Sequence, residues 1–255
     1  MHTEWSGKSL GPILEQLPDG EIEQVQIGLR WTAVVSHSER GRRCGLASTR
    51  RIKQGHGRDV LPEAGQLHSL PAGELAAAIL EHPHPLMHSV GLAAINSLLA
   101  PVDEFAGDPD AANLMAHLGA GRHVAVVGHF PFTEKLRKNV GQLDVLEKDP
   151  RAGDLPAEAA QRVLPECDVI AVTAMTLLNG SFETLEELFP EHATVIMLGP
   201  STPLSPLMFE HGLDILAGSV VENVEAVIHG VAQSASYRQL HTLGIRKVMM
   251  RKNKP

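Results

Sequence analysis

Cysteine and aromatic residues are both scarce in this 255-residue chain. Its two cysteines, Cys44 and Cys167, lie far apart and form no CxxC or Cys/His spacing, so neither a disulfide framework nor a structural zinc site is indicated. Because Cys167 precedes an apolar segment, we expect it to be buried and structural rather than nucleophilic. Aromatic residues make up 4% of the chain, so the core must come from aliphatic side chains and methionine.

Positive charge is also in deficit, with 22 Lys and Arg against 30 Asp and Glu and a net charge of −8. Nucleic-acid binders need clustered cations, so this balance argues against nucleic acid and anionic membranes as partners. The richest basic stretch, residues 40–53, is interpreted as a solvated strand and loop, with a local anion site as the alternative. No apolar run approaches the roughly 18 residues of a membrane span, and no signal-peptide core is visible. We therefore expect a cytoplasmic protein.

Residues 100–109 hold two prolines, a glycine and three acids, which is typical of a linker. They predict one domain over residues 1–105 and a second over 106–255. In the first, strands are expected at Glu21–Leu29, Trp31–Ser36 and Gly41–Ser48. Helices are expected at Ala72–Leu80 and Ser89–Leu99. The first half is thus predicted to be a small α+β unit in which a meander precedes a helical hairpin.

The second half alternates short apolar strands with helical segments. Such strands are typical of a parallel sheet covered on both faces, so this half is predicted to be a Rossmann-like α/β domain. The expected strands are His123–Val127, Gln142–Glu147, Asp168–Thr173, Ala193–Leu198 and Leu213–Ala217, with an edge strand at Lys247–Met250. The expected helices are Thr133–Val140, Pro156–Leu164, Phe182–Leu188, Pro206–His211 and Val220–Gln233.

In parallel sheets ligands bind beyond the carboxyl ends of the strands. That rule selects five expected loops, at residues 128–132, 147–150, 173–179, 199–203 and 218–219. The first loop is not a dinucleotide fingerprint, because Gly128 is its only glycine. Glu147 nevertheless ends the next strand at the spacing of a ribose-binding acid, with a solvated strand end as the alternative. His129 is a candidate proton shuttle or ligand contact, or else an exposed loop residue.

Two further loops gather hydroxyl and amide side chains. Thr173, Thr176 and Asn179 precede a helix expected to start near Ser181, which suits an anion or polar ligand. Local capping is the equal alternative. The Gly199–Pro203 loop, with Ser201 and Thr202, is either an anion cradle or an ordinary turn.

Histidine is abundant, with 14 residues. His82, His84 and His88 cluster around Pro83 and Pro85, and closely spaced histidines can bind transition metals. Because Pro85 limits helix formation there, a polar loop between two helices is the favoured interpretation.

Several motifs together resemble the bacterial and archaeal family named putative heavy-metal chelation proteins. They are VAVVGHFPF at 124–132, LE at 146–147, DVIAVTAMTLLNGS at 168–181, LGPSTPLSP at 198–206 and, in the first half, SVGLAAINSLL at 89–99. The resemblance implies an enolase N-terminal-like domain, a Rossmann-like domain, and a site in the cleft between them. Carried over by position, the implied ligand-binding residues are Asn96, Gly128, Glu147, Thr173, Thr176, Asn179, Gly199, Ser201 and Thr202, and His129 adjoins them.

Three functions stay open. The first is binding of a polar or anionic small molecule in the cleft, a metal or metal chelate included, with a role in heavy-metal or metallophore handling. The second is an enzyme that uses a nucleotide or S-adenosylmethionine, and the third is a non-catalytic interaction protein. The cofactor is correspondingly a divalent metal ion or a nucleotide-like ligand. A homodimer stays open because homodimers are the commonest soluble assemblies, although no seam is visible in the sequence.

Overall fold

The computed structural model describes residues 7–50, 61, 63–100 and 110–252. The predicted domain boundary near residue 105 lies outside these residues, as do Arg51 and Lys53 of the basic stretch. The small sheet has the antiparallel order β1-β2-β3, as the meander predicted, and it consists of β1 (Gly20–Ile27), β2 (Trp31–Ser38) and β3 (Gly41–Ser48).

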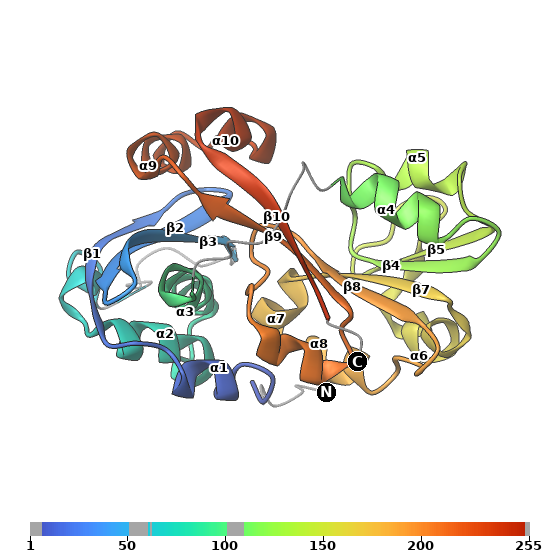
Figure 1. Cartoon of the computed structure of the whole chain (residues 1–255), viewed down its shortest axis with the longest axis horizontal. Helices are drawn as coiled ribbons and strands as arrows, with labels where there is room; N and C mark the ends of the chain where they lie inside the picture. The colour runs from blue at the N-terminus through green and yellow to red at the C-terminus, as the bar shows by residue number, and fades with distance from the viewer. Residues whose placement is uncertain (1–6, 51–60, 62, 101–109, 253–255) are drawn as a thin grey trace.

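Helices α2 (Ala72–Glu81) and α3 (Pro85–Leu98) lie on one face of this small sheet (Figure 1). Helix α3 begins at Pro85, four residues before the expected start at Ser89. Proline suits the first turn of a helix, where its missing N–H costs nothing. The side chain of His84 accepts a hydrogen bond from the Leu86 N–H, 3.2 Å away, and so caps the helix. The residues around His84 and His88 are therefore a helix start rather than the expected polar loop.

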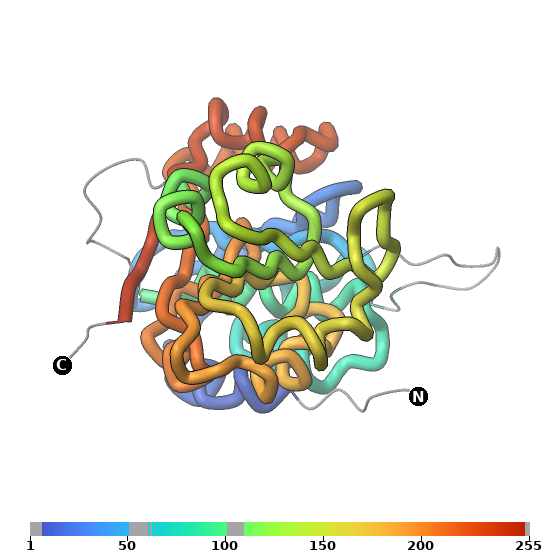
Figure 2. The backbone as a smooth tube through the Cα atoms, turned by 90° about the vertical axis from the view of Figure 1, so that its right-hand side faces the viewer, coloured from blue at the N-terminus to red at the C-terminus, as the bar shows by residue number. Residues whose placement is uncertain are grey.

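The opposite face of the small sheet is covered by α9 (Val224–Ala232) and α10 (Tyr237–Leu243), which come from the far end of the chain. Val227 and Val231 of α9 pack with Ala33 and Val35 of β2 in one buried cluster. Figure 1 shows the two red helices above the blue strands, and Figure 2 shows the same arrangement from the side. β2 is thus buried on both faces, which explains its continuous rather than alternating apolar pattern.

Among the described residues, seven strands form the large sheet, in the order β10-β9-β8-β7-β4-β5-β6. All neighbours are parallel except β9 and β10, and the result is the predicted Rossmann-like sheet. The strands are β4 (His123–Val127), β5 (Gln142–Glu147), β6 (Leu155–Pro156), β7 (Val169–Thr173), β8 (Thr194–Leu198), β9 (Ile215–Val221) and β10 (Ile245–Arg251). The chain runs outward from β4 through β5 to β6 and then returns to the other side of β4 as β7. The strand order therefore reverses between β4 and β7, where doubly wound folds bind ligands.

Short helices complete the fold. They are α1 (Gly11–Glu15), α4 (Ala111–Leu118), α5 (Thr133–Arg137), α6 (Ala160–Val163), α7 (Met175–Asn179) and α8 (Phe182–Glu186). The part of the chain that the structure describes also has 3₁₀ turns at Leu67–Ser69, Ala157–Ala159, Leu164–Glu166 and Pro206–His211. No helix in the described ranges is long and apolar enough to cross a membrane.

Four local expectations were wrong. Residues 218–219 are not a loop, because Gly218 and Ser219 continue β9 by pairing with Val248 and Lys247 of β10. The helix expected from Val220 consequently begins only at Val224. The loop expected over 173–179 contains α7, which ends at Gly180 in the left-handed region. The helix expected over 156–164 is broken into 3₁₀ and α segments.

Close backbone contact and one ion network fix the small sheet between its two helical layers. A Cβ on Gly45 of β3 would meet the Ala93 carbonyl oxygen and the Ser97 N–H nitrogen of α3. On the other face, Arg42 forms ion pairs with Glu23 of β1 at 2.7 Å and Glu225 of α9 at 2.8 Å. Hydrogen bonds from Arg42 and His37 lower the pKa of Glu23 to about 2.

Replacing Gly45 by alanine is expected to lower the melting temperature by several degrees. The added methyl group would have to push α3 away from β3, and overpacking costs about 1–3 kcal/mol, or roughly 2–4 °C per kcal/mol in a chain of this size. Gly73→Ala in α2 is the matched control, because a Cβ there meets nothing within 4 Å. Calorimetry of both variants checks the prediction, and equal melting temperatures would contradict the close α3–β3 contact.

Candidate functional site

A pocket of about 1140 Å³ opens at the carboxyl ends of β4, β7 and β8. Its walls come from the loops that follow these strands, from the β1–β2 turn and the end of β3, and from α10 and β10. The pocket therefore includes the point between β4 and β7 where the strand order reverses. Both the small sheet and the large sheet contribute to it.

Four of the residues singled out in the sequence line this pocket. His129 follows β4, Thr173 ends β7, and Gly199 and Ser201 follow β8. These residues lie close together because they follow parallel strands, whose carboxyl ends lie along one edge of the sheet.

Gly128 does not line the pocket, but it precedes the lining residues His129 to Phe132. Its φ of +100° is in the region that favours glycine, and a Cβ there would come within 2.8 Å of the Thr173 Cγ2 atom. The residue thus allows the end of β4 to turn closely past the end of β7. That turn is what directs His129 and the following aromatic residues to the pocket.

Thr176 and Asn179 make local hydrogen bonds, of the kind that the capping alternative expects. The Thr176 hydroxyl donates to the Thr173 carbonyl at 2.7 Å. The Asn179 Oδ1 atom accepts from the Ser181 hydroxyl at 2.6 Å and from its N–H at 3.1 Å. Neither residue lines the large pocket, so their side chains arrange the chain around α7.

Glu147 ends β5 as expected but does not line the pocket. Its carboxylate accepts a hydrogen bond from the Lys148 N–H at 3.2 Å. Burial and the nearby Arg50 guanidinium lower the pKa of Lys148. Arg50 itself donates to the Leu178 carbonyl at 2.7 Å, where it meets the end of α7.

Hydrogen bonds of Asn96 and Ser201 join the two sheets. The Asn96 Nδ2 atom donates to the Leu46 carbonyl at 2.9 Å and to the Ser201 carbonyl at 3.2 Å. The Ser201 hydroxyl accepts from the Ser48 N–H at 2.8 Å and donates to the Ser48 hydroxyl at 3.2 Å. Thr202 donates to the Ala217 carbonyl at 3.3 Å. The Asn96 and Ser201 bonds hold the loop after β8 against β3 and α3, and the Thr202 bond holds the same loop against β9.

Asn96 also borders a void of about 20 Å³ between α3 and the end of β9. Its Oδ1 atom is buried, and no hydrogen-bond partner for it lies in the described part of the chain. A void of that size holds about one water molecule. The amide therefore serves the joint between the sheets rather than the large pocket, which it does not line.

Sequence reasoning missed the cationic side chains of the pocket. They are Arg30 in the β1–β2 turn, Lys135 in α5, Arg238 in α10 and Lys247 in β10, and His241 of α10 also lines the pocket. Asp110 is the one acidic residue among the described lining residues, and it caps α4 by accepting from the Ala112 and Asn113 N–H groups. No local motif predicted these side chains as a group, because they are scattered along an acidic chain.

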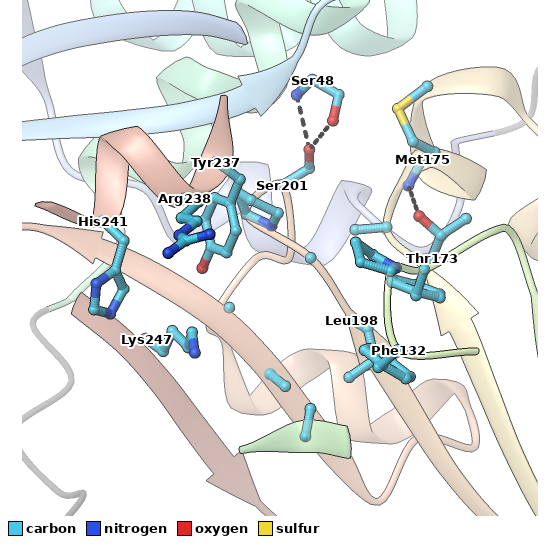
Figure 3. Close-up of a pocket in the computed structure, with 18 of the residues that line it drawn as sticks. Ser48, Phe132, Thr173, Met175, Leu198, Ser201, Tyr237, Arg238, His241 and Lys247 are labelled. Carbon is cyan, nitrogen blue, oxygen red and sulfur yellow. Dashed lines mark hydrogen bonds between the residues drawn. The ribbon is translucent and has the colours of Figure 1, made fainter. Parts of the chain in front are cut away.

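Figure 3 shows how the two sides of the pocket differ. Arg238, His241 and Lys247 lie on one side, beside Tyr237, whose hydroxyl is 2.8 Å from the Ser219 hydroxyl. Phe132 and Leu198 lie on the other side. The arrangement suits a ligand with an acidic part and an apolar part.

The described residues do not fit a resident metal ion. No group of three or more His, Cys, Asp or Glu side chains with metal-binding geometry occurs among them. In the histidine cluster, His84 caps α3, and the His88 Nε2 atom lies 2.9 Å from the His82 carbonyl. In the pocket, the His129 Nδ1 atom is 3.8 Å from the Asp154 carboxylate, which makes a pair rather than a cage.

Two family models match the chain, and both are described as putative heavy-metal chelation. One (DUF364) covers residues 110–250 and the other (DUF4213) covers residues 12–99. The chain belongs to this family. The motif resemblance seen in the sequence is thereby confirmed over nearly the whole chain.

Solved structures agree with this assignment. A family protein of unknown function from Desulfitobacterium hafniense is 27% identical, with a TM-score of 0.82 over 98% of this chain and 99% of that one. A second, from Pyrococcus horikoshii, is 17% identical and shares the fold, with a TM-score of 0.75 over 98% of this chain and all of that one. An uncharacterized protein of Methanocaldococcus jannaschii is 26% identical over 147 residues, and the match spans 57% of its length.

Replacing Asn96 by alanine is expected to destabilise the protein by about 1–3 kcal/mol, because two carbonyl groups at the joint lose their donor. Asn113→Ala, at an exposed position of α4, is the matched control. Denaturant titration of both variants measures the difference. An unchanged free energy of unfolding in Asn96→Ala would contradict the structural role and return Asn96 to the candidate ligand contacts.

Proposed function

We propose that this protein binds an anionic small molecule in the pocket at the strand ends, and that any metal it handles arrives already held by such a molecule. The observation that carries the proposal is the cationic lining of the pocket by Arg30, Lys135, Arg238 and Lys247. Charge-assisted hydrogen bonds to carboxylate or phosphate are among the strongest polar contacts that such side chains make.

The charged side chains that line the pocket are mainly positive, although the chain as a whole is negative. The protein carries a net charge of −8, yet the described residues around this pocket include four Lys or Arg side chains and a single acid. A cleft lined by one sign of charge raises the local concentration of the opposite ion. This local reversal supports an anion as the ligand.

The donor set favours a chelate over a bare ion. The described residues hold no group of three metal-ligating side chains, and ammonium and guanidinium groups repel free cations. A metal complex with an excess of carboxylate or phosphate groups is itself an anion. The pocket volume of about 1140 Å³ is slightly above the roughly 300–1,000 Å³ that is usual for ligand sites, so it has room for a chelator around a metal. The family description is compatible with this form of metal handling.

A nucleotide is the second candidate, and the reversal of strand order between β4 and β7 supports it. Two observations weigh against it. The loop after β4 carries the stacked rings of Phe130 and Phe132, 5.2 Å apart, in place of a glycine-rich turn. Glu147, the expected ribose acid, does not line the pocket.

Calorimetric titration with citrate, iron(III) citrate, zinc chloride and ATP separates these candidates. We expect citrate and iron(III) citrate to bind with one site, and zinc chloride to give no stoichiometric binding. Arg238→Gln should weaken citrate binding about tenfold, because a hydrogen bond to a charged group is worth about 1.5–3 kcal/mol. Arg162→Gln, an exposed residue of α6 outside the pocket, is the matched control.

Two results would overturn the proposal. One is stoichiometric zinc binding that persists in Arg238→Gln while citrate gives no heat. The other is ATP binding that Glu147→Ala abolishes, because that loss would establish the nucleotide site instead.

A further inference from the structure

The pocket has two chemically different ends, which is more than a simple anion site requires. Arg238, His241 and Lys247 lie at the α10–β10 end, whereas Phe132 and Leu198 lie at the β4–β8 end (Figure 3). Lys135, three residues after Phe132, adds a cation near the second end, but a small inorganic anion would leave Phe132 and Leu198 uncovered. The second end must be explained by another part of the ligand.

Aromatic side chains concentrate in this pocket. They make up 4% of the chain, yet Trp31, Phe130, Phe132 and Tyr237 all line it. Phe130 and Phe132 are stacked, with an interplanar angle of 16°. At the α10–β10 end, Trp31 and Tyr237 meet at a tilt, with ring centroids 6.0 Å apart. Flat rings of this kind offer faces and edges on which another flat apolar group packs.

The exposed apolar surface points to the same place. Among the described residues, Leu29 is the one large hydrophobic side chain classed as exposed, and it lines this pocket. A single exposed leucine is ordinary, but this one shares its pocket with four aromatic rings, and larger apolar surface that is rimmed by polar residues is typical of a binding site. A ligand that covers Leu29 and the aromatic rings would bury apolar surface, and this burial would add to the binding free energy that charge alone supplies.

The cationic end offers side chains that are available for a ligand. The side chains of Arg238 and His241 form no hydrogen bond or ion pair with the described part of the chain, and both are exposed on α10. Arg238 belongs to a helix that is itself held in place. The Trp31 Nε1 atom donates to the Ala235 carbonyl at 3.0 Å, and Ser236 and Gln239 form a capping box at the start of α10.

We infer that the ligand of this pocket is an amphipathic anion, a flat apolar ring system that carries an acidic group at one end. The acidic group binds at Arg238 and His241, and the ring system packs toward Phe132 and Leu198. This inference rests on the proposed function, since it specifies the class of anion that the same pocket takes.

A pair of fluorescent probes tests the inference. The first is 1-anilinonaphthalene-8-sulfonate, whose flat naphthalene carries a phenylamino group and one acidic group, and the second is N-phenyl-1-naphthylamine, the same ring system without the acid. Each is titrated into the wild-type protein, Arg238→Gln, Phe132→Ala, the milder Phe132→Leu, and the control Arg162→Gln. Thermal melts identify any variant that fails to fold, and Phe132→Leu then stands in for Phe132→Ala.

We expect the sulfonate probe to bind at one site and the neutral probe to bind more weakly. Arg238→Gln should weaken the sulfonate probe about tenfold and leave the neutral probe unchanged. Either substitution of Phe132 should weaken both probes severalfold, because each loses the same ring contact. Arg162→Gln should leave both affinities unchanged.

Failure of the inference is distinguishable from failure of the proposed function. Citrate binding that depends on Arg238, together with sulfonate-probe binding unaffected by any substitution of Phe132, would retain the anion site and overturn the amphipathic ligand. Absence of citrate and sulfonate-probe binding would overturn both. Equal weakening of the two probes by Arg238→Gln would also overturn the inference, since the acidic group would then have no specific partner.

Discussion

Burial of β2 on both of its faces is the constraint on which the rest of the structure depends. Val34 packs toward the α2–α3 side, and Ala33 and Val35 pack toward α9. A strand of this kind needs two apolar covers, and the second comes from the far end of the chain. Docking of α9 and α10 on the small sheet places Arg238 and His241 beside the strand ends of the large sheet. The pocket is therefore a consequence of how the small sheet is buried.

The sequence predicted the elements better than their contacts. Local apolar patterns indicated the meander, the helical hairpin and the parallel strands, because those patterns reflect burial within one element. The packing of α9 on β2 could not be predicted from the sequence, because the apolar pattern of each element shows that it is buried but not which element covers it. For the site, the strand-end rule led to His129, Thr173, Gly199 and Ser201. The cationic wall was missed because residues 30, 135, 238 and 247 meet only after folding.

The joint between the sheets gives a reason for polar residues that resemble ligand contacts. Asn96, Ser201 and Ser48 form a chain of hydrogen bonds that fixes the loop after β8 against β3. Ser201 also lines the pocket, so the same bonds hold one pocket wall at a set distance from the small sheet. In this proposal, the cationic and aromatic side chains bind the ligand, and the serine and amide groups hold the pocket walls in alignment.

The most direct measurement is a crystal structure of the protein grown with iron(III) citrate, with iron located by its anomalous scattering. The account predicts an iron peak inside the pocket, surrounded by citrate oxygens, with carboxylates facing Arg238 and no protein atom in the iron coordination sphere. Iron bound directly by His, Asp or Glu side chains at about 2.0–2.2 Å, the usual range for metal ligands, would contradict it and establish a protein-held metal ion instead.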